Sequence, residues 1–154
     1  MRVTSPENWH LRYLGKPWAG VPNPPESYTC GELLRAVHLD LLGIETPPVP
    51  APDARVLKDC IDSMLPGFYG LWPLPDGEAP REFDSVFLSR NRYEDHCGIA
   101  CMTADGLLIL HCQQRVGVHL SGPGELLASG YRVLRWYRHE RMDAALTERG
   151  WLHA

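Results

Sequence analysis

Residues 28–43, YTCGELLRAVHLDLLG, carry the clearest structural signal in the chain. Thr29 followed three residues later by Glu32 matches a capping box, in which an N-cap Ser or Thr is paired with a Glu of the first turn. Gly43 suits the left-handed residue that ends many helices. Apolar residues fall between these signals at helical spacing, namely Leu33, Leu34, Val37 and Leu41. The stretch predicts a helix with Thr29 as its N-cap and Cys30 as its first residue.

After residue 80 the apolar residues follow a spacing of two, which is typical of strands. We predict strands at Phe83–Ser89, Cys97–Met102, Leu107–Cys112, Val116–Leu120 and Tyr131–Tyr137. Earlier in the chain, a second helix is predicted from Asp53 with Cys60 on its apolar side, and Leu71–Arg81 is predicted to be a loop. A last short helix is expected over Asp143–Arg149. Helices followed by an antiparallel meander predict an α+β domain.

The length of 154 residues fits one domain spanning residues 1–154. A formal net charge of −4 argues against nucleic-acid and anionic-membrane partners. No apolar run approaches the roughly 18 residues of a membrane span. Residues 1–17 lack the apolar core of a classical secretory signal, so we expect synthesis in the cytoplasm. The five cysteines are odd in number, which without such a signal favours reduced thiols over a disulfide framework.

Cys30 is the first candidate for chemistry. A thiol at a helix N-terminus lies at the positive end of the helix dipole, beside backbone N–H groups that have no partner, and both favour the thiolate. The other interpretation is that Cys30 is a small core residue, as many buried cysteines are.

Two histidines form the second candidate. Residues 103–106, TADG, predict a hairpin turn, and pairing outward from it places His96 and His111 one diagonal step apart on the same sheet face. Gly98 and Ala100 lie on that face too and are expected to leave room for something to pack closely. A helix-N-terminal cysteine that faces a sheet presenting two histidines is the arrangement of a papain-like thiol hydrolase.

The sequence resembles the NlpC-type cell-wall cysteine peptidases over about residues 9–138. Six segments carry the resemblance, in the same order as in the family. Residues 13–18 are similar to "YxGxPY", residues 28–34 to the nucleophile motif "DCSGLV", residues 83–87 to the strand "GDLVLF", and residues 96–99 to "HVGI". The other two are residues 42–44, which precede a proline-rich turn, and residues 110–111, which match the third catalytic position. Departures include Thr29 in place of Asp and Trp18 in place of Tyr.

The resemblance implies a papain-like fold with Cys30 as nucleophile, His96 as base and His111 as the orienting residue. It also implies hydrolysis of the amide between γ-D-glutamate and a diamino acid in peptidoglycan stem peptides, with no cofactor and no metal. Substrate and oxyanion contacts are expected from Trp18, Tyr13 and Thr29, because an indole N–H, a hydroxyl and the Cys30 backbone N–H can donate to an oxyanion.

Three alternatives stay open. A zinc site built from the histidines and cysteines of the hairpin is disfavoured, because Cys97 and Cys112 alternate away from the histidines. His119 is the runner-up for the third catalytic position, and His38 is expected at the surface or the rim of the first helix. A catalytically silent binding or assembly module is the stronger rival, since phage-tail components can keep the fold. Assembly partners in a virion, or delivery to the periplasm or wall by a signal-independent route, are compatible with the sequence.

Overall fold

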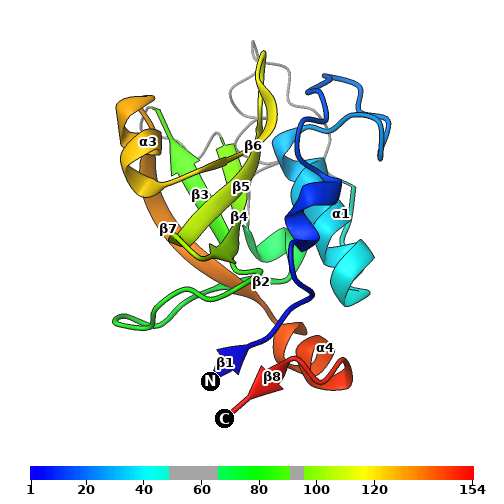
Figure 1. Ribbon diagram of the computed structural model, residues 1–154, viewed down its shortest axis with the longest axis vertical. Helices are drawn as coiled ribbons and strands as arrows, with labels where there is room; N and C mark the ends of the chain where they lie inside the picture. Colours follow the sequence, from blue (N-terminus) through cyan, green and yellow to red (C-terminus); the bar gives the residue numbers. More distant parts are fainter. Residues whose placement is uncertain (49–65, 91–95) are drawn as a thin grey trace.

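The computed structural model describes residues 1–48, 66–90 and 96–154, and it combines helices with an antiparallel sheet (Figure 1). The predicted α+β class is confirmed. The predicted helix from Asp53, together with Cys60, lies outside the described residues. In chain order the elements are β1 (Arg2–Val3), the 3₁₀ helix η1 (Trp9–Arg12), α1 (Cys30–Leu42), the 3₁₀ helix η2 (Pro66–Tyr69), β2 (Leu71–Pro73), β3 (Ser85–Ser89), β4 (His96–Thr103), β5 (Gly106–Gln113), β6 (Gly117–Ser121), α3 (Pro123–Ala128), β7 (Arg132–His139), α4 (Met142–Glu148) and β8 (Leu152–His153).

The main sheet of the described residues has the strand order β2-β7-β3-β4-β5-β6, and every neighbouring pair is antiparallel. The predicted β4–β5 hairpin is confirmed, with Met102 opposite Leu107 and Thr103 opposite Gly106. A second, two-stranded sheet joins β1 to β8, so the two ends of the described chain lie side by side (Figure 1). The sheet therefore positions residues from four consecutive hairpin strands next to one another.

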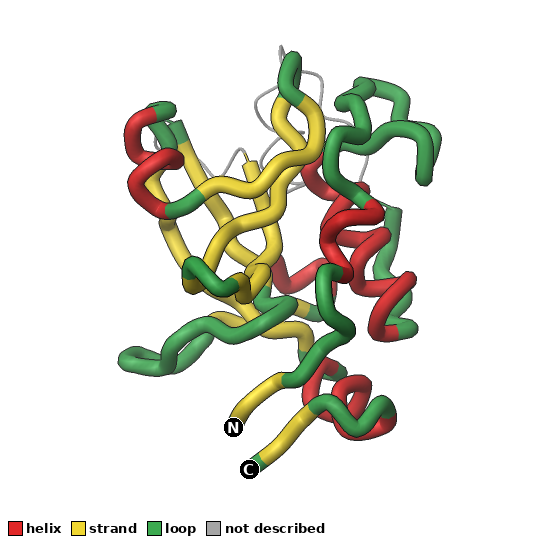
Figure 2. The backbone as a smooth tube through the Cα atoms, in the orientation of Figure 1, coloured by secondary structure: helices red, strands yellow, loops and turns green. Residues whose placement is uncertain are grey.

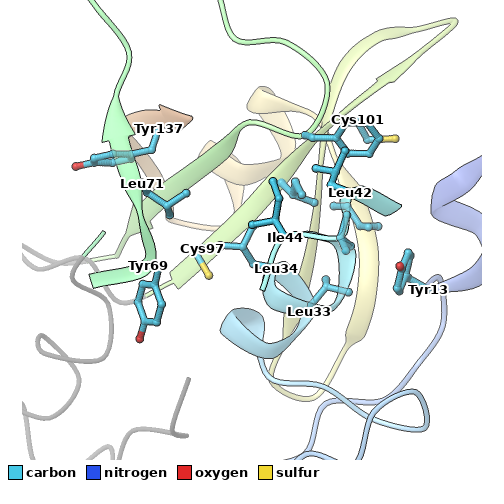
Figure 3. Packing of buried hydrophobic residues seen from close by; sticks show 14 of the residues in the cluster. Tyr13, Leu33, Leu34, Leu42, Ile44, Tyr69, Leu71, Cys97, Cys101 and Tyr137 are labelled. Carbon is cyan, nitrogen blue, oxygen red and sulfur yellow. The ribbon is translucent and has the colours of Figure 1, made fainter. Parts of the chain in front are cut away.

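Helix α1 begins and ends where the sequence predicts. The Thr29 hydroxyl accepts a hydrogen bond from the Glu32 N–H at 3.2 Å, which satisfies one of the unpaired donors of the first turn. Gly43 follows the last helical residue with φ 64°, in the left-handed region that glycine adopts without steric cost. The apolar stripe of the helix is buried in the main core, where Leu33 and Leu34 pack in one cluster with Cys97 (Figure 3).

The sheet has a core on each face. Alternation along the strands divides the side chains, since successive residues point to opposite sides. On one side Phe87, Ile99 and Leu110 pack with α1. On the other side a smaller cluster contains Val86, Leu88, Ile109, Tyr131 and Leu126 of α3. Helices α1 and α3 accordingly lie on opposite sides of the sheet (Figure 2).

Two expectations about this part of the protein are wrong, and one helix was not predicted. Leu71–Arg81 is not all loop, because Leu71–Pro73 forms the edge strand β2 beside β7. An edge position tolerates Pro73, since one side of the strand needs no ladder hydrogen bond. His38 is not at the surface: it is buried, and its Nε2 lies 3.3 Å from the Phe83 carbonyl oxygen. The short helix α3 was not predicted at all.

Within the described ranges, no helix combines the length and the apolar character that crossing a membrane requires.

Candidate active site

The half-buried side chain of Cys30 lies at the start of α1. The first backbone N–H groups of a helix have no intrahelical partner, so the N-terminus of α1 offers donors next to the thiol. The Thr29 hydroxyl is buried and engaged in capping the helix. Thr29 thus fixes where the helix begins, and with it the position of the cysteine.

Cys30 meets His96 at the end of the sheet, not across its face. The expectation that α1 faces the sheet surface bearing both histidines is wrong, because α1 packs on the side that carries Cys97. Alternation places His96 and His111 on the opposite side. The β4–β5 ladder starts where residue 99 pairs with residue 110, while residues 96–98 pair with β3 and residues 111–113 pair with β6. The two strands lack ladder pairing at this end, and it is here that the thiol interacts with the His96 imidazole.

A line of hydrogen bonds continues from His96 into the sheet. His96 Nε2 lies 2.8 Å from His111 Nδ1, and His111 Nε2 lies 2.7 Å from Ser121 Oγ. All three side chains are buried. We call Cys30, His96, His111 and Ser121 the relay. Since Nε2 of His96 is engaged with His111, Nδ1 is the ring nitrogen left for the thiol of Cys30.

The surroundings favour the Cys30 thiolate. Hydrogen bonding from the Cys97 thiol is the largest cause that holds the pKa of Cys30 well below its usual value, and the His96 imidazole adds to it against the opposing effect of burial. The same interaction raises the pKa of Cys97, because Cys97 is held in its protonated, donating form. A thiolate next to an imidazole is the reactive form of a cysteine nucleophile.

His111 is held neutral. Burial, with smaller contributions from His96 and His119, lowers its pKa to about 3. A neutral imidazole has one donor and one acceptor nitrogen. For His111 Nδ1 to accept a hydrogen bond from His96, the proton of the neutral ring has to be on Nε2. His111 then donates from Nε2.

Aromatic rings and backbone enclose the two histidines. The His96 ring stacks on Tyr131, with the ring centres 5.0 Å apart and the planes at 23°. The space expected beside Gly98 is already filled, because a Cβ there would lie 2.5 Å from Ile109 Cγ2 and 3.2 Å from His111 Cβ. The expectation that Gly98 leaves room for a ligand is thus wrong, and this glycine instead allows β5 to approach β4 closely.

His119, the runner-up for the third position, lies beside the relay. Its ring centre is 4.2 Å from that of His111, the residue opposite it across β5 and β6. Its Nδ1 is 3.1 Å from the Gly117 carbonyl oxygen, to which it can donate. The residue hydrogen-bonded to His96 is His111.

The two aromatic residues expected at the oxyanion lie in different places. The Tyr13 hydroxyl is buried and donates to Asp40 Oδ2 at 2.9 Å, and the backbone of Asp40 lies about 15 Å along the helix axis from that of Cys30. The structure thus does not bring the Tyr13 hydroxyl to the cysteine. Trp18 is half-buried and forms a backbone bridge with Tyr28, which places it near the start of α1.

Sequence reasoning missed two members of this site. Ser121 is the last residue of a strand and is followed by a glycine. Serine is common at such turn positions, so the local sequence does not mark Ser121 as a functional residue. Cys97 was assigned to the core; its place directly after His96 was the available signal of proximity to the site. Among residues 1–48, 66–90 and 96–154, no three His, Cys, Asp or Glu side chains are grouped to hold a metal ion.

Comparison of the chain with protein-family models and with curated proteins found no match.

Proposed function

We propose that the protein is a thiol-dependent amidase or endopeptidase with a papain-like, NlpC-type fold. The observation that carries the proposal is the placement of Cys30 beside His96, whose ring is in turn hydrogen-bonded to His111. This arrangement has a cysteine of lowered pKa at a helix N-terminus, an imidazole beside it, and a second imidazole that orients the first at 2.8 Å. Those are the three functions that a thiol hydrolase needs.

The reaction follows from these positions. The Cys30 thiolate attacks the amide carbonyl, and the oxyanion that forms is stabilised by the backbone N–H of Cys30 at the start of α1. His96 protonates the leaving amine from Nδ1. Water then attacks the thioester with His96 acting as the base, which frees the thiol. His111 keeps the His96 ring oriented throughout.

The substrate class rests on the sequence resemblance, which implies peptidoglycan stem peptides cut between γ-D-glutamate and a diamino acid. One backbone feature supports the resemblance. Phe83 has φ 71°, a left-handed conformation that is uncommon for a bulky residue. The family segment that residues 83–87 resemble begins with Gly, the residue that adopts this conformation most readily. The partner would then be the cell wall, reached from a virion or by a signal-independent route.

The test is digestion of purified peptidoglycan, with release of soluble fragments followed by mass spectrometry. Wild type should release stem-peptide fragments, and Cys30→Ala should lower the rate by at least about 1,000-fold. Cys101→Ala is the matched control, because Cys101 is a fully buried thiol on β4 that has no part in the relay. Equal activity of Cys30→Ala and wild type would contradict the assignment, and loss of activity with a chelator would favour a zinc enzyme.

A catalytically silent assembly module is the alternative outcome. It predicts that wild type releases no fragment from any wall tested and that Cys30 reacts with iodoacetamide no faster than the buried thiol of Cys101. The alkylation measurement needs no substrate, so it separates an inactive site from a wrongly chosen wall.

A further inference from the structure

Ser121 is the last residue of β6 and is 5% exposed. Its Oγ lies 2.7 Å from His111 Nε2, a normal distance for a good hydrogen bond. The strand pairing sets this position, because Ser121 is the Cα partner of Ile109 and both are on the histidine side of the sheet. The next residue, Gly122, caps α3, so the backbone of Ser121 is held between a strand and a helix.

The proton positions in the relay depend on what Ser121 does. When His96 is an imidazolium, both of its nitrogens carry protons, and its Nε2–H needs an acceptor at His111 Nδ1. A neutral His111 then carries its own proton on Nε2. That N–H points at Ser121 Oγ, which can accept it.

The opposite arrangement would disable the base. If His111 carried its proton on Nδ1, it would donate to His96 Nε2, and a neutral His96 would keep its proton on Nδ1. His96 would then have no lone pair to receive the thiol proton of Cys30. Which nitrogen of His111 carries the proton therefore decides whether His96 can act as the base for Cys30.

We propose that Ser121 is a positioning residue that accepts the Nε2–H of His111 and so keeps His111 Nδ1 free to orient His96. The inference deepens the proposed function and rests on it for the role of His96. Without the hydroxyl, the buried Nε2–H of His111 would have no partner, and a buried unsatisfied donor is costly. His111 would then favour the tautomer protonated on Nδ1, which opposes the imidazolium of His96.

Other ionisable groups lie near the relay, and the variants that are compared in a pH measurement have to keep these residues unchanged. Each belongs to a neighbouring element of the fold: Glu32 on α1, Tyr69 on η2, Cys97 on β4, Cys112 on β5, His119 on β6, and Tyr131 with the Arg90 guanidinium over its ring. Among these groups, it is the His119 ring that contacts His111. His119 is therefore the alternative to Ser121 as the residue that sets the tautomer of His111.

The first experiment measures the rate of alkylation of Cys30 by iodoacetamide from pH 5 to pH 9, with peptide mass spectrometry, in wild type, Ser121→Ala, Ser121→Thr and His119→Phe. Ser121→Ala should move the midpoint upward by about one pH unit and slow the reaction at pH 6 roughly tenfold. Ser121→Thr keeps an acceptor hydroxyl and should restore the wild-type profile. His119→Phe should leave it unchanged. A wild-type profile in Ser121→Ala, or the shift appearing in His119→Phe instead, would overturn the inference.

The second experiment reads the tautomer directly, by ¹⁵N NMR of the imidazole nitrogens of His111. The proton should lie on Nε2 in wild type and move to Nδ1 in Ser121→Ala, with Ser121→Thr like wild type. A proton on Nδ1 in wild type would contradict the inference. This readout needs neither hydrolysis nor a reactive Cys30. A failure of wild-type Cys30 to react at low pH would count against the proposed function, whereas the tautomer result would still decide for or against Ser121.

Discussion

The two ends of β4 bury polar side chains in different ways. At the His96 end lies the relay, in which each hydrogen bond joins groups that can exchange a proton. Beyond residue 99 lies the carboxylate cluster, which we define as Glu82, Asp84 and Arg138. Asp84 accepts two hydrogen bonds from the Arg138 guanidinium, at 2.8 and 2.7 Å, and a third from the Arg81 backbone N–H. Glu82 accepts from two side chains and one backbone N–H.

The difference separates stability from chemistry. In the carboxylate cluster the acceptors are matched to permanent donors, so a change of protonation breaks bonds that hold β3, β4 and β7 together. In the relay the imidazoles can donate or accept, so proton movement is possible with the bonds kept. We therefore expect variants of the cluster to change unfolding and variants of the relay to change the reactivity of Cys30.

The largest effect is expected in the carboxylate cluster. Arg138→Met leaves the fully buried Asp84 carboxylate without its bidentate partner, and removing one member of a buried pair typically costs about 3–5 kcal/mol of unfolding free energy. Urea denaturation would measure the loss. The double variant Asp84→Asn with Arg138→Met has no unpaired charge in the buried position of Asp84, although Glu78, which is partly exposed, also loses Arg138, and it should recover most of the loss. A single variant that loses less than about 1 kcal/mol would remove the distinction between the two ends.

At the relay end, Gly98→Ala tests the close approach of β4 and β5. The new Cβ would lie 2.5 Å from Ile109 Cγ2 and 3.0 Å from the Leu110 carbonyl oxygen, so the strand carrying His111 has to move. A displacement of about 1 Å at a catalytic group can cost roughly 100-fold in rate. Alkylation of Cys30 at pH 6 should slow by about that factor. Gly124→Ala is the control, because a Cβ at Gly124 meets nothing within 4 Å; equal rates in both variants would contradict the expected displacement.

A smaller effect is expected from Cys97→Ala. The Cys97 thiol supplies the largest contribution that lowers the pKa of Cys30, so its removal should raise that pKa. We expect the midpoint of Cys30 alkylation to move to higher pH, so that the reaction at pH 6 becomes slower. Cys101→Ala, a second fully buried thiol on the same strand, should leave the midpoint in place. A shift of similar size in both variants would mean that loss of packing, and not the thiol, is responsible.

How far the sequence predicts the molecule also differs between regions. Local signals sufficed for α1 and for the β4–β5 hairpin, because caps, spacing and the turn at residues 103–106 act within a few residues of one another. The pairing rule then placed His96 and His111 on one side of the sheet. It could not say which side α1 covers, since that depends on the packing of distant elements. The line from His96 through His111 to Ser121 joins three strands, and no local pattern encodes it.

Single polar residues were the other source of error. A lone histidine such as His38 gives no periodic signal. Its burial is possible because the ring has a hydrogen-bond partner inside the fold, the Phe83 carbonyl oxygen. The hydroxyl of Tyr13 was expected to contact the oxyanion, because a hydroxyl can donate a hydrogen bond to it. In the fold the segment runs along α1, and Asp40 takes the hydroxyl.

The smallest effect concerns His38, the buried histidine next to the carboxylate cluster. Burial is the main cause that lowers its pKa to about 4, and the neighbouring His139 adds to it. The unfolded chain, with a histidine pKa near 6.5, therefore takes up a proton before the folded protein does. The stability that neutral His38 provides is fully present above pH 6.5 and is lost as the pH falls from 6.5 towards 4.

By this linkage His38 contributes a loss of about 1 kcal/mol between pH 8 and pH 6. Urea midpoints at the two pH values would measure it, and His38→Gln should flatten the dependence by about that amount, because glutamine keeps an amide donor for the Phe83 carbonyl and has no charge to gain. The pKa of His111 is also lowered by burial, and His111 remains in the variant, so part of the acid sensitivity should persist. If His38→Gln kept the full dependence, the loss would belong to the other buried histidines, His111 of the relay and His139 beside His38, whose pKa values burial also lowers.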